Sequence, residues 1–192
     1  MKRVLVLSGG GAKGAFQYGA IKFIYEEVFK APNENHFDVI AGVSVGCLNG
    51  AMLSMKKYAE LKTVWENIDN DQVFKGKVKT IPSLFRLMIG RKSILSNQPL
   101  KELIDKYVFQ EHVCETCDFR LGVVDLPKGD YYSLRPTDFD NNEDFRKAIL
   151  ASTVMPVIWE PVDQIRTKGH GHLKDVVDGG LRNISPLGDV IE

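Results

Sequence analysis

Cysteine, net charge and long apolar runs are all scarce in this sequence. Its 192 residues include three cysteines, and 25 basic side chains balance 25 acidic ones. Three cysteines are too few for a disulfide framework, which indicates a reducing, cytoplasmic compartment. Balanced charge gives no overall attraction to nucleic acid, so we expect no nucleic-acid partner.

The chain also lacks an apolar stretch of the roughly 20 residues that a membrane-spanning helix needs. Its first apolar run, residues 4–7, ends at Ser8 and three glycines, so it is too short for the core of a signal peptide. Apolar residues make up 44% of the chain and charged residues 26%, the composition of a globular protein. We expect a single domain over residues 1–192, cytoplasmic and at most peripheral to a membrane.

The order of apolar patterns predicts an α/β fold. Apolar runs at residues 4–7 and 38–43 predict buried strands, and a helical pattern follows each of them, over 13–30 and 46–54. Turn residues at 127–130 predict a hairpin. The other expected elements are helices over 58–69, 97–108 and 142–151 and strands over 119–126, 131–134 and 173–177. Such alternation of strands and helices is typical of layered α/β proteins.

Residues 73–95 differ from the rest of the chain. They combine six basic side chains with many apolar ones and contain no acid. This composition predicts an insertion outside the core, which either covers the site as a lid or contacts an anionic bilayer. A packed helix with a solvated basic face is the alternative.

The sequence GVSVG at residues 42–46 is the strongest local signal for chemistry. A nucleophile elbow needs Gly42 and Gly46 because the chain passes too close to itself there for a Cβ, and the tight turn exposes the Ser44 hydroxyl. The apolar strand before it and the small-residue helix after it are the context that this motif requires. A tight turn with an incidental serine is the other interpretation.

A second motif, GGGAKG at residues 9–14, follows the first predicted strand. It fits the G-x-G-x-x-G pattern of dinucleotide-binding loops, but that pattern expects an acid at the end of the second strand, and Asp38 lies at its start. The loop lacks the Lys-Ser/Thr pair of a phosphate-binding P-loop. Backbone N–H groups of a glycine loop can also stabilise an oxyanion. A turn without a ligand is the third possibility.

A third motif, Asp178-Gly179-Gly180, comes directly after the last apolar strand. Its position holds a carboxylate at a strand end, where open α/β sheets place their sites. A simple Asp-Gly turn is the alternative, and Asp175, inside the strand, is the competing carboxylate.

In their order along the chain, these motifs resemble the patatin-like phospholipase family. Ala151-Ser152 and the sequence MPVIWEP at 155–161 also match. The resemblance implies a three-layer α/β sandwich with a mainly parallel central sheet. It also implies a serine–aspartate dyad that hydrolyses carboxylic ester bonds of phospholipids or lysophospholipids without a cofactor or metal.

The resemblance also implies a role for each matching residue. Ser44 is expected to be the nucleophile that forms an acyl-enzyme, and Asp178 its base. The glycine loop is expected to form the oxyanion hole with Lys13 bracing it. The remaining expected site residues are Gly9, Gly10, Gly11 and Gly14 in that loop, Gly42 and Gly46 at the elbow, and Gly179 and Gly180 after the base.

Other interpretations of the same residues remain open. A Ser-His-Asp triad would use His170 or His172, which come late in the chain as a triad histidine does. A general carboxylesterase, thioesterase or acyltransferase would use the same site, and a nucleotide-binding module would use residues 9–14. The lone C-x-x-C at Cys114 and Cys117 is expected to be a loop before a strand, with metal or redox roles as alternatives.

Some properties are not predicted by the sequence. They are the head group, the ester position, the acyl length, an activating partner and the oligomeric state. The chain ends fourteen residues after Asp178, where family domains usually continue with a further strand and helix. We therefore expect either a short family member or one truncated at its C-terminus.

Overall fold

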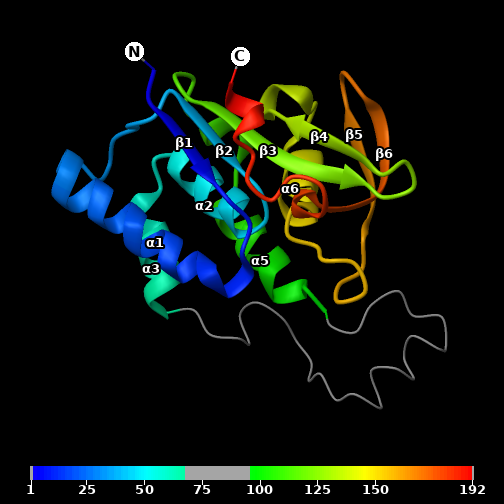
Figure 1. The fold of residues 1–192 in the computed structure, drawn as a ribbon, viewed down its shortest axis with the longest axis horizontal. Helices are drawn as coiled ribbons and strands as arrows, with labels where there is room; N and C mark the ends of the chain where they lie inside the picture. Colours follow the sequence, from blue (N-terminus) through cyan, green and yellow to red (C-terminus); the bar gives the residue numbers. More distant parts are fainter. Residues whose placement is uncertain (1, 68–95, 192) are drawn as a thin grey trace.

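A computed structural model describes residues 2–67 and 96–191 (Figure 1). The strands are β1 (Val4–Leu7), β2 (Val39–Gly42), β3 (Asp118–Asp125), β4 (Asp130–Leu134), β5 (Val162–Thr167) and β6 (Gly171–Asp178). The helices are α1 (Gly14–Phe23), α2 (Val45–Ser54), α3 (Tyr58–Asn67), α5 (Gln98–Tyr107) and α6 (Asn142–Ala151). The basic segment 73–95 lies outside the described residues, so its expected role as a lid or membrane contact stays a prediction.

The six strands form one mixed sheet. The first three, β1, β2 and β3, run parallel, β6 runs antiparallel to β3, and β5 runs antiparallel to β6. β4 pairs antiparallel with β3 as the predicted hairpin. Four of the six strands, β1, β2, β3 and β5, therefore point the same way, which confirms a mainly parallel sheet.

The register along β3 brings the ends of β2 and β6 together. β2 pairs with residues 118–121 of β3, and β6 pairs with residues 123–125. β4 pairs with residues 121–125, so it occupies the opposite edge, and β2 and β6 share one edge of β3. Since β2 and β6 run in opposite directions, their C-terminal ends meet near the middle of β3.

Layers cover both faces of the sheet. Gly50 of α2 lies against Ile40 and Phe119, so α2 packs on the face that carries these side chains. Successive residues of a strand point to opposite faces, and Arg120 contacts Asp189 with its guanidinium on the other face. The second outer layer therefore includes the C-terminal segment with its short 3₁₀ helices η6 (Gly179–Leu181) and η7 (Gly188–Val190).

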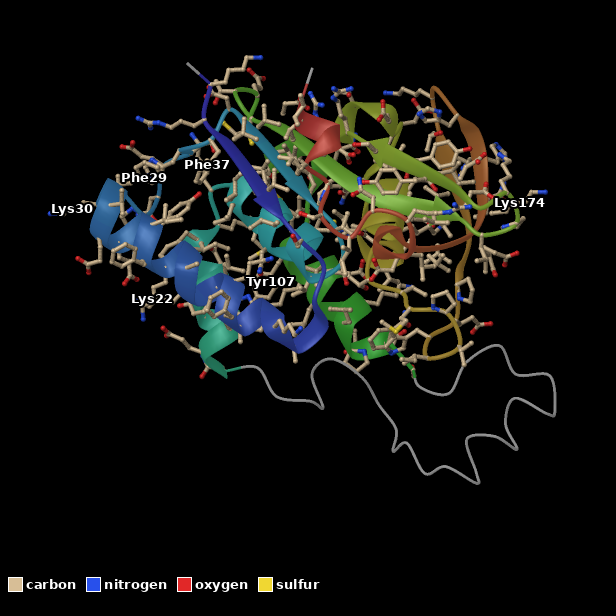
Figure 2. All side chains as sticks on the ribbon, in the orientation of Figure 1. Lys22, Phe29, Lys30, Phe37, Tyr107 and Lys174 are labelled. Carbon is tan, nitrogen blue, oxygen red and sulfur yellow. The ribbon has the colours of Figure 1, made fainter. Side chains whose placement is uncertain are left out.

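Most predicted helices and strands are present. The predicted helix over 13–30 consists of α1 and a π-helix, η2 (Ile24–Phe29), which ends where Lys30 takes a left-handed φ of 55°. Aromatic rings pack together at the C-terminal end of η2, where the ring centroids of Phe29 and Phe37 are 5.8 Å apart (Figure 2). β5 was missed because its sequence, VDQIRT, carries exposed polar side chains at three of its six positions and forms no apolar run.

None of the helices in residues 2–67 and 96–191 is both long enough and apolar enough to cross a membrane.

Candidate active site

The GVSVG segment forms a sharp turn between β2 and α2. Ser44, at its apex, has φ 58° and ψ −132°, a strained conformation for a residue with a side chain. A methyl group at Gly42 would overlap the Gly46 carbonyl, and one at Gly46 would overlap the Leu7 carbonyl. The two glycines are therefore required by close backbone approach, which is the geometry expected of a nucleophile elbow.

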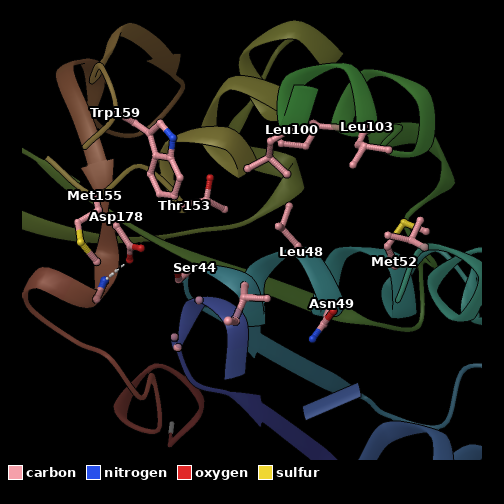
Figure 3. A pocket seen from close by; sticks show the side chains of 18 of the residues that line it. Ser44, Leu48, Asn49, Met52, Leu100, Leu103, Thr153, Met155, Trp159 and Asp178 are labelled. Carbon is pink, nitrogen blue, oxygen red and sulfur yellow. Dashed lines mark hydrogen bonds between the residues drawn. The ribbon is translucent and has the colours of Figure 1, made fainter. Parts of the chain in front are cut away.

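Asp178 ends β6 beside this turn, as Figure 3 shows. Its N–H donates to the Val154 carbonyl at 2.9 Å, and its carboxylate accepts the Gly180 N–H at 2.7 Å. Burial, with 7% of Asp178 exposed, raises the pKa of its carboxyl, although the Ser44 side chain and the Gly180 N–H oppose this rise. A carboxyl group with a raised pKa is a better proton acceptor for a serine than a solvated one.

The residues of the glycine loop do not have equivalent roles. The Gly9 N–H donates to the Ile184 carbonyl at 2.8 Å, and the Gly14 N–H bonds within its own helical turn. Gly14 is instead required for packing, since a Cβ there would overlap Val45 and Trp65. This geometry leaves the N–H groups of Gly10 and Gly11 as the candidate oxyanion donors.

Lys13 lies beside this loop rather than in the cavity. Its side chain is exposed, its stem is 3.3 Å from where a Cβ on Gly10 would stand, and its N–H donates to the Gly10 carbonyl at 3.1 Å. These contacts fit the bracing role expected of Lys13.

An apolar cavity of about 860 Å³ opens from this site. Ser44, Asp178, Gly180 and the loop residues 9–11 line one end of it. Mostly apolar side chains line the rest, from α2, α3, α5 and the 155–159 loop, together with the polar Asn49 and Thr153 (Figure 3). A largely apolar lining suits a hydrocarbon chain better than a nucleotide.

A chain of polar side chains supports the glycine loop, and no sequence motif predicts it. The Gln17 side chain donates to the Ser8 carbonyl at 3.0 Å and accepts from Asn49 at 2.9 Å. Asn49 in turn accepts from the Trp65 indole at 2.8 Å. Asn49 is only 1% exposed. These bonds tie the residue before the loop to α1, α2 and α3.

The alternative residues lie elsewhere. His170 contacts the Tyr132 ring, and His172 hydrogen-bonds Gln164 across the β5–β6 hairpin. The cavity lining contains neither histidine, so the structure does not assemble a Ser-His-Asp triad. Among the described residues, no group of three His, Cys, Asp or Glu side chains could hold a metal ion.

The C-x-x-C pair lies in a turn that enters β3. The Cys117 N–H donates to the Cys114 carbonyl at 2.9 Å, and Cys117 is buried in the core. Burial raises the pKa of the Cys117 thiol to about 12. This arrangement matches the expected loop before a strand.

Comparison with known proteins decides the family. The model of the family described as patatin-like phospholipase matches residues 5–191. The chain belongs to this family. The family is described as one of phospholipases, which are hydrolases, and the resemblance drawn from the ordered motifs is confirmed.

Two known proteins are similar to this chain, one in sequence and one in structure. It is 30% identical over 122 residues to the cUMP-AMP-activated phospholipase of Escherichia coli, which covers 64% of this chain and 33% of that protein. The structure of VipD from Legionella pneumophila matches with a TM-score of 0.54 and 15% identity, over 94% of this chain and 46% of VipD. The chain thus spans about a third of its curated relative, and the VipD match supports the α/β fold.

Proposed function

We propose that this patatin-like chain hydrolyses carboxylic esters of phospholipids or lysophospholipids through a dyad of Ser44 and Asp178. The observation that carries the proposal is that Ser44, on the strained elbow, and the buried Asp178 carboxylate line the same apolar cavity. A hydroxyl poised on a strained elbow beside a carboxyl with a raised pKa is the arrangement of an activated nucleophile.

The mechanism follows from the positions of these groups. The Ser44 hydroxyl attacks the ester carbonyl while Asp178 takes its proton. The N–H groups of Gly10 and Gly11 stabilise the oxyanion, and each such donor contributes about 2.7–4 kcal/mol in comparable sites. Asp178 then protonates the leaving alcohol. Water, deprotonated by Asp178, hydrolyses the acyl-enzyme and releases the fatty acid.

The acyl chain of the substrate is proposed to lie along α2. Ser44, Leu48 and Met52 line the cavity at successive helical turns, with Leu100 and Leu103 of α5 facing them (Figure 3). Eight residues of α-helix span about 12 Å. An extended alkyl chain advances about 1.25 Å per carbon, from a C–C bond of about 1.52 Å, so this length suits about ten carbons.

The dyad is tested by intact mass after treatment with an alkyl fluorophosphonate. We expect one adduct on the wild type and on Ser185→Ala, and none on Ser44→Ala. Ser185 is a suitable control because its hydroxyl lies near the glycine loop, bonded to Ser8 at 3.0 Å. A folded wild type without an adduct, or an adduct of equal yield on Ser44→Ala, would refute the proposal.

The acyl-chain proposal predicts the effect of Leu48→Trp. The indole would fill the cavity one turn beyond Ser44, so we expect the ratio of kcat/KM for a decanoyl ester to that for a butanoyl ester to fall at least about tenfold. Leu126→Trp, on the exposed β3–β4 turn, should leave the ratio unchanged. Hydrolysis of a p-nitrophenyl ester series measures both. An unchanged ratio in Leu48→Trp would place the acyl chain elsewhere.

A further inference from the structure

Ser152 lies beneath the elbow and contacts the nucleophile through its backbone. It follows the last residue of α6, and its side chain is fully buried. Its hydroxyl oxygen accepts the Ser44 N–H at 3.1 Å, and its proton goes to the Gly122 carbonyl of β3 at 2.8 Å. Because a hydroxyl has one proton, the bond to Gly122 directs an oxygen lone pair at Ser44.

The hydrogen bond to Ser152 satisfies the backbone N–H of Ser44 in the elbow. Ser44 precedes the first turn of α2 and has a positive φ, and its N–H bonds to the fully buried Ser152. A buried N–H without a partner is costly, and a strained residue persists only where its surroundings over-determine it. Ser152 supplies both the partner and the constraint.

The acceptor of the Ser152 proton also supports the base. Gly179, the residue after Asp178, lies so close to Gly122 that a Cβ on Gly179 would stand 2.5 Å from the Gly122 carbonyl carbon. Asp178 itself pairs with Val123, the next residue of β3. One short stretch of β3 therefore holds the base directly and holds the nucleophile through Ser152.

We propose that Ser152 is a positioning residue that sets the orientation of Ser44 relative to Asp178. This inference rests on the dyad proposed above. Ser152 does not line the cavity, whereas its neighbour Thr153 does, so Ser152 acts through the Ser44 backbone and not on the substrate. Its removal should slow acylation and leave substrate binding unchanged.

The test compares Ser152→Ala and Ser152→Cys with Ser54→Ala. Ser54 is a matched control because it is also fully buried and donates its hydroxyl to a carbonyl, that of Ala51 at 2.9 Å. It ends α2, the helix that Ser44 precedes. We expect kcat and the rate of fluorophosphonate labelling to fall about 10- to 100-fold in Ser152→Ala, with KM within about twofold of wild type. Ser54→Ala should lower the melting temperature about as much as Ser152→Ala does, and it should keep the kcat of the wild type.

Ser152→Cys keeps the side-chain shape with a slightly larger γ atom and weakens the hydrogen bonds, so we expect a folded variant with an intermediate kcat. It tests the inference if Ser152→Ala does not fold. The inference fails if both variants keep the kcat of Ser54→Ala, or if KM rises while kcat is unchanged. A wild type that is not labelled would instead refute the dyad itself, so the two failures are distinguishable.

Discussion

Asp178→Asn should lose about 10⁴-fold in kcat/KM for a soluble ester, because an amide cannot take the proton of Ser44. The substitution conserves the shape of the site. The amide oxygen can still accept the Gly180 N–H, which bonds the carboxylate at 2.7 Å. Loss of activity in a folded protein would therefore report the missing base and not a collapsed loop.

The same variant should melt at a higher temperature than the wild type at pH 7. Burial raises the pKa of Asp178 in the folded state above its unfolded value, so the folded protein holds this proton more tightly. Stability contributed by Asp178 is then present below the unfolded pKa and is lost as pH rises through the folded pKa. The rise in melting temperature of Asp178→Asn over the wild type should be absent near pH 3 and complete above the folded pKa of Asp178. Each kcal/mol of unfolding free energy should correspond to about 2–4 °C.

Melting temperatures from pH 3 to pH 8 measure this gain, and activity is followed in parallel. Asp163→Asn, at an exposed position of β5, is the control, and its activity should equal that of the wild type. The base role of Asp178 would be wrong if Asp178→Asn kept more than about a tenth of the activity. A lower melting temperature of this variant at pH 7 would contradict the raised pKa.

Gly46→Ala is expected to be the most destabilising single substitution considered. The added methyl would overlap the Leu7 carbonyl and approach the Ser8 carbonyl to 2.8 Å, and neither backbone group can move without shifting β1 and the glycine loop. We expect a loss of at least about 4 kcal/mol of unfolding free energy, which corresponds to about 8–16 °C in a chain of this size. Fluorophosphonate labelling should be lost with it.

Gly19→Ala is the matched control for this change. Gly19 is an exposed residue inside α1, and nothing lies within 4 Å of its expected Cβ. Alanine in a helix interior stabilises by about 0.5–1 kcal/mol relative to glycine, so this variant should melt slightly higher than the wild type. Gly46→Ala melting within about 3 °C of the wild type would show that the elbow does not require close backbone approach.

Features that depend only on residues adjacent in the chain could be predicted from the sequence. The elbow at 42–46 and the hairpin turn at 127–130 are local, because a tight turn and its glycines lie within a few residues. β5 is not predicted by local pattern, since its polar sequence VDQIRT forms a strand through pairing with β6. Nor could sequence distinguish Gly9 from Gly10, because the partner of the Gly9 N–H, Ile184, comes 175 residues later.

The sequence by itself determined the α/β class, the strained serine turn, the carboxylate at a strand end and the family. Only the tertiary structure decided that Ser44 and Asp178 meet. They meet because β2 and β6 approach each other head to head along one edge of β3, a register that long-range pairing sets. The role of Ser152 has the same origin, since its hydroxyl joins residues 108 and 30 positions away, and no local pattern encodes such contacts.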